Sequence, residues 1–393
     1  MFKNFLDLGD QPLANSYLLK NNSLKKEITY KLKVGINLKN YLVSIQNIVP
    51  KEQMFNEKYP YRSSISCTMR SSFKNLAKKI LKNFKPQFIL EIGSNDGAFV
   101  KNFNKNIVVG IEPCKNLAKI TRKYGYKTFS SYWNLTLAKK ITRYKKANII
   151  YSANTISHIK DLDSVIIAID FALAKDGILI IEDPSLMECL KLNAYDQFYC
   201  EHIYVFSAIA IANIFKKYNF EIFRIEKIKT HGGSNRYYIK RKDNKNYIIE
   251  KSCQDLITNE IKYGLKKYST YLKFKKKVSK SKIKLVQLLN YFKKKKLKVI
   301  GYGATAKSVT VLNYCKINKN LISYFLDTTP EKVEKYLPGC KILIKNYKKL
   351  DKKDADIVFL GAWNFKDEIL KKEKKFISKG GKFITHVPYP RVI

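Results

Sequence analysis

Two carboxylates flank a glycine turn at a spacing that suits a ligand carrying a ribose. The apolar run Phe88–Ile92 predicts a buried strand that carries Glu91, and the glycine turn Gly93–Gly97 follows it and opens a helix. Glycine lets the backbone approach a ligand closely, and amides at a helix N-terminus attract a carboxylate. A second expected strand, Ile107–Ile111, delivers Glu112, 21 residues after Glu91, where it can bind ribose hydroxyls.

This layout predicts a pocket for S-adenosylmethionine. The pattern differs from the Gly-x-Gly-x-x-Gly spacing of dinucleotide-binding proteins, because an acidic residue ends the strand and one glycine opens the turn. The alternative is a tight strand–helix turn that binds no ligand. Asn154 and His158 follow the expected strand Ala147–Ser152, and ligands lie beyond the strand ends of an open parallel sheet. The sequence leaves two roles for His158: it could line the pocket, or it could be a hydrogen-bonded structural residue. The expected cofactor-binding residues are Glu91, Gly93, Ser94, Asn95, Asp96, Gly97, Glu112 and Asn154.

A cluster of polar side chains, Tyr199–His202, stands in an otherwise apolar neighbourhood. Burying such groups without partners is unfavourable, so they are either satisfied together or functional. An imidazole can act as a general base near neutral pH, and Glu201 or a tyrosine hydroxyl could orient His202. Neighbours on a strand point to opposite faces, so adjacency alone does not establish a contact between Glu201 and His202.

Two glycine-containing turns lie further along the chain. Thr230–Ser234 could hold a phosphate or a sugar, although such turns are common. Gly301–Lys307 follows an expected strand, opens a helix and resembles a phosphate-cradling loop; Asp327 stands 26 residues after Gly301, a loose spacing. Either turn could also be purely structural. The expected substrate-binding residues are His231, Gly232, Gly233, Ser234, Tyr302, Gly303 and Lys307.

The elements that would position these residues predict an α/β protein of several domains, since 393 residues exceed one ordinary core. We expect a small N-terminal domain over 1–70, a central Rossmann-like domain over 71–245, and a C-terminal Rossmann-like domain over 246–393. A lysine-rich helical region over 251–296 connects the last two. The two α/β halves follow a similar order, which suggests sheets of related topology. The expected strands, beyond those given above, are Tyr30–Val34, Tyr41–Ile48, Gly177–Ile181, Glu221–Ile228, Arg236–Lys240, Lys298–Gly301, Ile322–Leu326, Ile357–Leu360 and Phe383–His386.

Composition narrows the class of protein. The chain contains no apolar run of about 18 residues and no signal-peptide pattern at its start, so we expect a cytoplasmic protein without a membrane partner. A net charge of +44 is typical of proteins that bind nucleic acids. However, only eight of the 76 basic residues are Arg, whose guanidinium binds phosphates better than the ammonium of Lys. A/T-rich codons explain the lysines. Seven scattered cysteines without a Cys-x-x-Cys pair fit reduced thiols.

Taken together, these motifs resemble those of the three-part sugar C-methyltransferases, which methylate a nucleotide-linked keto-deoxysugar. The resemblance covers almost the whole chain, and such phrases in this order are highly specific. The matching phrases are Leu8–Tyr17, Glu91–Gly97, Tyr199–His202, Thr230–Ser234, Gly301–Ala304 with Lys307, Leu312–Cys315 and Ala362–Phe365.

The resemblance implies that His202 is the catalytic base, with Tyr199 and Glu201 beside it and with Tyr61 and His158 lining the same site. It implies a class I methyltransferase domain in the centre and a C-terminal domain that helps to hold a nucleotide-diphosphate sugar. Members of the family carry an N-terminal zinc site of four cysteines. Where the second pair is expected, this chain has Asn37 and Asn40, which are poor zinc ligands, so we expect no metal.

Three alternatives stay open. The same pocket could serve O-methylation of a sugar or another small metabolite. The lysine excess could serve a nucleic-acid-binding protein. The chain could also bind a sugar nucleotide without catalysis, although the retained acids, glycines and histidine argue against that. We expect a monomer or a weak homodimer without a nucleic-acid partner.

Overall fold

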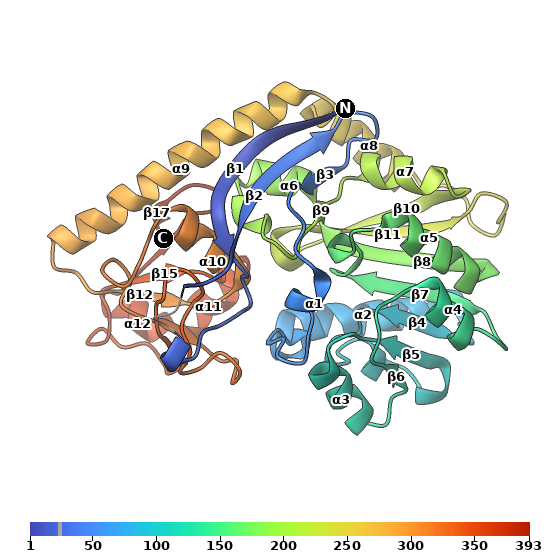
Figure 1. The fold of residues 1–393 in the computed structure, drawn as a ribbon, viewed down its shortest axis with the longest axis horizontal. Coiled ribbons are helices and arrows are strands. Elements are labelled where there is room, and N and C mark those ends of the chain that lie inside the picture. Colours follow the sequence, from blue (N-terminus) through green and yellow to red (C-terminus); the bar gives the residue numbers. More distant parts are fainter. Residues whose placement is uncertain (23–25) are drawn as a thin grey trace.

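The structure is a computed structural model that describes residues 1–22 and 26–393. Within these residues the strands form three sheets, of four, seven and six strands. Two α/β units lie side by side, and the long strands β1 and β2 of the small N-terminal sheet lie between them (Figure 1). The fold is the expected α/β architecture with two Rossmann-like units and a small N-terminal part.

The N-terminal sheet is completed by a strand from the central unit. Its order is β1-β2-β3-β9, all antiparallel, with β1 (Phe2–Pro12), β2 (Thr29–Asn37), β3 (Val43–Ile45) and β9 (Tyr204–Val205). Strand β1 was not among the expected strands, and a register irregularity between Asp7 and Asp10 absorbs Gly9 in it. The buried side chains of this sheet share one apolar core with both larger units. The N-terminal part is therefore held by packing.

The central sheet has the order β10-β11-β8-β7-β4-β5-β6. The strands from β6 to β8 are parallel, and β10 and β11 form an antiparallel pair at one edge. Its strands are β4 (Ile89–Ile92), β5 (Val108–Ile111), β6 (Thr128–Phe129), β7 (Ala147–Ala153), β8 (Leu173–Pro184), β10 (Phe220–Ile228) and β11 (Ser234–Arg241). The helices in this part of the chain are α1 (Lys51–Met54), α2 (Cys67–Phe84), α3 (Lys115–Lys123), α4 (Leu135–Ile141), α5 (Leu162–Ala172), α6 (Leu186–Lys191) and α7 (Ala208–Lys216).

Two local expectations in this unit are wrong. The glycine turn after β4 does not open a regular helix; only the single turn Val100–Asn102 forms. The Asn102 side-chain amide donates to the carbonyls of Ala98 and Phe99, a local bond that competes with helical pairing. The strand expected to begin at Gly177 begins earlier, so Asp176 and Gly177 lie inside β8, beside the register irregularity where β8 pairs with β7.

The C-terminal unit repeats the topology of the central one, as expected from the similar order of elements. Its sheet order, β14-β13-β12-β15-β16-β17, places the first strand in the middle, as β6-β5-β4-β7-β8 does. Its strands are β12 (Val299–Tyr302), β13 (Phe325–Asp327), β14 (Ile344–Asn346), β15 (Ile357–Leu360), β16 (Lys382–Thr385) and β17 (Arg391–Val392). Its helices are α10 (Ala306–Tyr314), α11 (Lys366–Lys372) and α12 (Lys374–Ser378).

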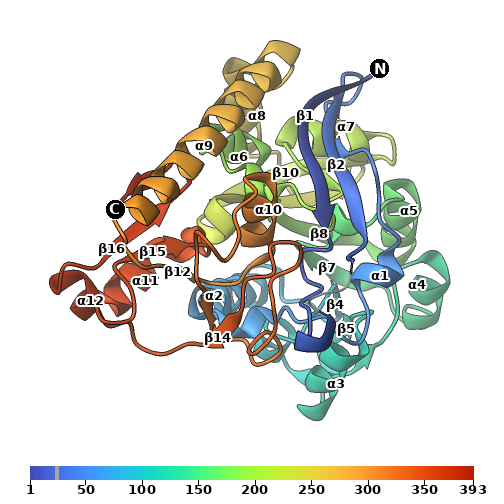
Figure 2. The ribbon, with the colours of Figure 1, turned by 60° about the vertical axis from the view of Figure 1, so that its left-hand side comes forward.

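A helical pair joins the two α/β units, as the lysine-rich region predicted. Helix α8 (Lys251–Tyr263) ends at the left-handed Gly264, and α9 (Tyr268–Lys294) then runs along the C-terminal unit (Figures 1 and 2). The buried face of α9 meets β1, with the Tyr271 and Phe5 ring centroids 4.9 Å apart. Among the described helices, none is long and apolar enough to cross a membrane.

Candidate active site

One cavity of about 770 Å³ connects all three parts of the chain. Its wall includes the glycine turn after β4, the end of β5, the imidazole of His202 and the loop that opens α10. In open parallel sheets ligands bind beyond the carboxyl ends of the strands. The strands β4, β5 and β7 of the central sheet and β12 of the C-terminal sheet all end at this cavity. The expected site residues that line it are Glu91, Gly93, Ser94, Asn95, Glu112, Asn154, Tyr61, His158, Tyr199, His202, His231, Tyr302, Gly303 and Lys307.

The glycine turn has the geometry of a ligand cradle. Gly93 has a φ of 78°, and a Cβ there would lie 2.0 Å from Thr155 Oγ1. The Glu112 carboxylate accepts hydrogen bonds from the Asn95 and Cys114 amides, each at 2.8 Å. Burial and the nearby Glu112 raise the pKa of Glu91, whose Oε2 has no hydrogen-bond partner within the described chain. Two carboxylates therefore lie at a turn that requires glycine, because a side chain at Gly93 would overlap Thr155.

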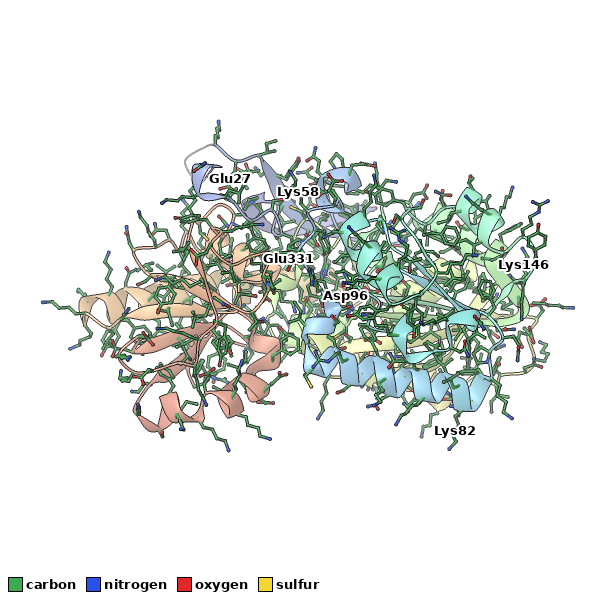
Figure 3. All side chains as sticks on the ribbon, turned by 90° about the horizontal axis from the view of Figure 1, so that it is seen from below. Glu27, Lys58, Lys82, Asp96, Lys146 and Glu331 are labelled. Atoms are coloured by element: carbon green, nitrogen blue, oxygen red, sulfur yellow. The ribbon has the colours of Figure 1, made fainter. Side chains whose placement is uncertain are left out.

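Asp96 binds a segment of the N-terminal part and does not line the cavity. Its carboxylate accepts hydrogen bonds from the Ser63 hydroxyl at 3.1 Å and from the amide and hydroxyl of Ser64. The next residue, Gly97, is left-handed with a φ of 82° and also lies outside the cavity wall. Beside this segment Arg62 pairs with Glu331 of the C-terminal unit. Asp96 and Glu331 both lie near the boundary between the units (Figure 3).

His202 is held as a neutral base by two hydrogen bonds. Its Nδ1 lies 2.7 Å from the Gln197 carbonyl, which can only accept, so Nδ1 carries the ring proton. Its Nε2 is therefore the acceptor for the Tyr199 hydroxyl at 2.6 Å. Burial, with His158 and Lys307 nearby, holds the pKa of His202 well below its ordinary value. Tyr199 is thus the group that orients His202.

Two further imidazoles share the site. The ring of His158 stacks on His202, with centroids 5.2 Å apart, and on Phe55 at 5.4 Å. Burial lowers the pKa of His158 to about 4, and its Nε2 has no hydrogen-bond partner in the described part of the chain. His231 Nε2 lies 3.4 Å from the Asn154 amide nitrogen. Three of the four histidines in the sequence therefore gather at one cavity.

Glu201 faces away from His202. Its carboxylate accepts hydrogen bonds from Asn15 Nδ2 at 2.7 Å and from the Tyr59 hydroxyl at 2.9 Å. Burial raises the pKa of Glu201 to about 7, and these two bonds oppose the rise. The carboxylate thus ties the N-terminal part to the loop that carries His202. The sequence did not single out Asn15 or Tyr59, although Asn15 lies in the phrase Leu8–Tyr17 and Tyr59 stands two residues before Tyr61.

Glu201 makes a testable contribution to stability. A carboxyl group whose folded pKa exceeds its unfolded value stabilises the fold below the unfolded pKa, and this contribution is lost as pH rises through the folded pKa. Between pH 4.5 and 7, the free energy of unfolding of the wild type should therefore fall relative to Glu201→Gln, by on the order of 3 kcal/mol, at about 1.4 kcal/mol per pKa unit. Urea titrations of both proteins at several pH values measure this. Parallel pH profiles would contradict it.

The turn Thr230–Ser234 positions His231 and contributes little else to the cavity wall. Gly232 packs against Trp363, with a built Cβ only 2.3 Å from the indole, and the Ser234 hydroxyl donates to the Thr230 carbonyl at 3.0 Å. Gly232, Gly233 and Ser234 lie outside the cavity wall. The Gln197 side chain fixes the turn by donating to the His231 carbonyl at 2.6 Å.

The loop after β12 lines the C-terminal wall. Gly303 has a φ of 83°, and a Cβ there would lie 2.6 Å from Ala362 Cβ. Asp327 stabilises this loop, because its carboxylate accepts hydrogen bonds from the Ala304 and Thr329 amides, each at 2.8 Å. Lys307, which opens α10, is buried and lines the cavity.

The residues of the N-terminal sheet do not fit a zinc site. The first 66 positions of the sequence contain neither Cys nor His. Asn37 and Asn40 instead shape the β2–β3 turn: Asn37 Oδ1 accepts from the Lys39 amide at 2.9 Å and Asn40 Oδ1 from the Leu42 amide at 3.1 Å. No cluster of three His, Cys, Asp or Glu suited to a metal occurs in residues 1–22 and 26–393.

Chelation provides a test of this conclusion. Treatment with EDTA is expected to leave the Tm of the protein unchanged, because packing and the Glu201 contacts hold the N-terminal sheet. Differential scanning calorimetry before and after dialysis against the chelator measures this. A fall of several degrees, restored by zinc, would contradict it.

Comparisons with known proteins fit this geometry. Three family models match consecutive parts of the chain: Putative zinc binding domain over 1–55, Methyltransferase domain over 61–225, and C-methyltransferase C-terminal domain over 229–388. The C-methyltransferase NovU of Streptomyces niveus is 26% identical over 394 residues, which cover 99% of this chain and 93% of that protein.

Solved structures similar to this chain include two methyltransferases. The magnesium protoporphyrin IX methyltransferase of Synechocystis PCC 6803 with bound SAH covers 44% of this chain and 83% of its own, at 13% identity and a TM-score of 0.35. A SAM-dependent methyltransferase of Thermotoga maritima covers 45% and 90%, at 19% identity and a TM-score of 0.33.

The sheet order, the glycine cradle and the matching family models define an S-adenosylmethionine-dependent methyltransferase. The three models together tile the chain, and the NovU match spans nearly all of it. The chain is thus an S-adenosylmethionine-dependent methyltransferase with the domains of a C-methyltransferase.

Proposed function

We propose that the protein methylates a carbon next to the ketone of a nucleotide-linked deoxysugar, with S-adenosylmethionine as the methyl donor. The observation that carries the proposal is the shared cavity. Its wall contains Glu91 and Glu112 at the glycine cradle, the neutral imidazole of His202, and Lys307 from the C-terminal unit. Donor site, base and a cationic wall thus open on one space.

The residues present fit the methyl donor. Bound S-adenosylmethionine supplies a methyl group on a positively charged sulfur. Glu112 keeps lone pairs for ribose hydroxyls after accepting its two amide bonds. Glu91 Oε2 and Asn154 Oδ1 are buried acceptors without partners in the described residues, and they await donors from a ligand.

Carbon methylation requires a nucleophilic carbon, which forms when a base removes a proton next to a ketone. We assign His202 Nε2 as the final acceptor of the C3 proton of a 4-keto sugar, because that nitrogen carries no proton of its own. The Tyr199 hydroxyl, already bonded to it at 2.6 Å, is the group through which the proton can pass. The enolate oxygen requires a donor, such as a hydroxyl or the imidazole of His158.

The C-terminal wall supports a nucleotide-diphosphate substrate. Lys372 lies with its ammonium 3.5 Å from the centroid of the Tyr347 ring, and both residues line the cavity. Arg62, from the N-terminal part, also lines the cavity, and it pairs with Glu331 of the C-terminal unit. The Lys372 ammonium suits phosphate oxygens, and the shared cavity would hold donor and acceptor close together, which can lower such a barrier by several kcal/mol.

The direct test supplies nucleotide-linked 4-keto-6-deoxyhexoses and S-adenosylmethionine to the purified protein and measures the product mass and the site of methylation. Carbon methylation also predicts loss of deuterium from C3 when the methyl donor is absent. A methyl group on oxygen, without deuterium loss, would favour O-methylation and overturn the assignment.

A nucleic-acid partner is not needed to explain the lysines. Lys58, Lys82 and Lys146 lie at widely separated points of the molecule (Figure 3). A dispersed charge suits solubility and attraction of small anions better than one binding groove. A steep salt dependence of RNA affinity would revive that alternative.

A further inference from the structure

The ammonium of Lys307 is enclosed yet free to bind a ligand. Its side chain is only 7% exposed and lines the cavity. Within residues 1–22 and 26–393, its Nζ makes no hydrogen bond to the protein, and it lies 5.4 Å from the centroid of the Trp363 indole. A buried cation is unfavourable without a partner, so three donor hydrogens facing a cavity indicate an anionic oxygen on the ligand.

Lys307 belongs to the histidine side of the cavity. Its charge lowers the pKa of both His202 and His231, in each case after the larger effect of burial. The indole beside it packs against Gly232, the neighbour of His231. The lysine therefore lies near His202 and His231, although it comes from the C-terminal unit.

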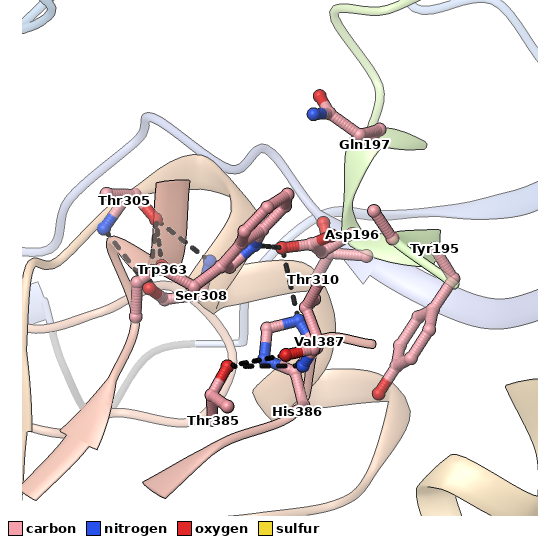
Figure 4. Close-up of polar contacts among 12 residues, drawn as sticks. Tyr195, Asp196, Gln197, Thr305, Ser308, Thr310, Trp363, Thr385, His386 and Val387 are labelled. Atoms are coloured by element: carbon pink, nitrogen blue, oxygen red, sulfur yellow. Dashed lines mark hydrogen bonds and ion pairs between the residues drawn. The ribbon is translucent and has the colours of Figure 1, made fainter. Parts of the chain in front are cut away.

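A buried carboxylate of the central unit accompanies this cation. Asp196 Oδ2 accepts from Trp363 Nε1 at 2.6 Å and lies 3.2 Å from His386 Nε2, both of the C-terminal unit (Figure 4). Burial alone would raise the pKa of Asp196, but His386, Lys307 and Trp363 outweigh it and hold that pKa low. Burial lowers the pKa of Lys307 to about 8, and Asp196 opposes the fall, so Lys307 stays mainly protonated at pH 7.

The same carboxylate adjoins the support of the base. The backbone carbonyl of Gln197, the next residue, accepts a hydrogen bond from His202 Nδ1. The side-chain amide of Gln197 donates to the His231 carbonyl. The turn that contains Asp196 and Gln197 thus holds His202, the proton acceptor, and also lies near Lys307. A neutral imidazole or hydroxyl would be a weaker donor to an enolate than a charged ammonium, because charge-assisted hydrogen bonds are about twice as strong.

We infer that Lys307 is a catalytic residue that binds the ketone oxygen of the substrate, and that Asp196 is its positioning residue. The inference rests on the proposed function. As the C3–H bond breaks, its proton goes to His202 Nε2 and its electron pair forms the C3–C4 double bond. The carbonyl π pair then moves onto oxygen, where the Lys307 ammonium balances the new charge.

The experiment separates this role from phosphate binding. Exchange of the C3 hydrogen with deuterium oxide is followed by NMR without a methyl donor, and binding of dTDP and UDP is measured by calorimetry. Lys307→Met is expected to lower the exchange rate at saturating substrate by about 10²–10³-fold, the usual effect of losing one oxyanion donor. Binding of the nucleoside diphosphates should change by less than about 2-fold.

Asp196→Asn keeps the shape and an acceptor for Trp363 but removes the charge. It should slow exchange by at least about 10-fold at saturation, with little change in KM, whereas damage to the interface alone would raise KM. Lys307→Gln provides a second uncharged variant if Lys307→Met does not fold. Lys372→Met is the matched comparison and should weaken binding of the nucleoside diphosphates.

The outcomes are distinct. Unchanged exchange in the Lys307 variants, with weaker nucleoside diphosphate binding, would make Lys307 a phosphate ligand and overturn the inference alone. No exchange in the wild type with any nucleotide-linked keto sugar would overturn the proposed function, and this inference with it.

Discussion

Asparagine in place of His202 is expected to lower kcat by about 10²–10⁴-fold, the usual contribution of a general base. The amide of asparagine can still donate to the Gln197 carbonyl, which lies 2.7 Å from Nδ1 in the wild type. It offers no basic nitrogen to the Tyr199 hydroxyl. The variant therefore keeps the loop and loses the proton acceptor. Product formation is measured by mass spectrometry at saturating keto sugar and S-adenosylmethionine.

Binding of S-adenosylhomocysteine is the control, and it should match the wild type because no described hydrogen bond links His202 to the glycine cradle. Tyr199→Phe should show a smaller loss, since Nε2 then keeps its lone pair but loses the hydroxyl at 2.6 Å. Near-wild-type turnover by His202→Asn would remove the base role. Loss of cofactor binding together with turnover would mean that the substitution acts through the fold.

The two large sheets follow from the sequence because most of their strands are buried, mainly apolar runs. Strands such as β4 and β15, which are buried along their whole length, carry that signal without needing any contact information. Most strands that the sequence did not predict are short and lie at or near sheet edges, as β6, β14 and β17 do. The exception is the 11-residue edge strand β1, whose sequence is interrupted by charged residues and Gly9. Strand β9 forms only because β3 lies beside it in the folded protein.

The candidate site divides in the same way. Glycines and acids after a strand are visible in sequence because turn geometry requires them. Contacts across long separations are not visible: Asn15 meets Glu201 over 186 positions and Trp363 meets Asp196 over 167. The Nδ1 of His202 is held by the backbone carbonyl of Gln197. The pattern of side-chain types along a sequence does not reveal a contact made by a backbone group. The Tyr199–His202 bond lay within reach of sequence reasoning because only three positions separate the partners.

Alanine in place of Gly93 is expected to weaken binding of S-adenosylhomocysteine by at least about 100-fold, or about 2.8 kcal/mol at 1.4 kcal/mol per tenfold. Two effects combine. A side chain at a φ of 78° costs roughly 1–2 kcal/mol, and its Cβ would lie 2.0 Å from Thr155 Oγ1, an overlap that costs about 1–3 kcal/mol to relieve. A turn that shifts to escape the overlap would move the Asn95 amide away from Glu112. Isothermal titration calorimetry measures the affinity.

Two companion variants separate these effects. Gly380 has a φ of 83° with nothing within 4 Å of a built Cβ, so Gly380→Ala carries the conformational cost alone and should bind the cofactor product normally. Gly93→Ala combined with Thr155→Ala removes the overlap and should recover part of the lost affinity. If Gly93→Ala bound as tightly as the wild type while Gly380→Ala lost stability as expected, the turn after β4 would not be the cofactor cradle. The methyl donor would then bind elsewhere in the cavity, because distortion of this turn would not change its affinity.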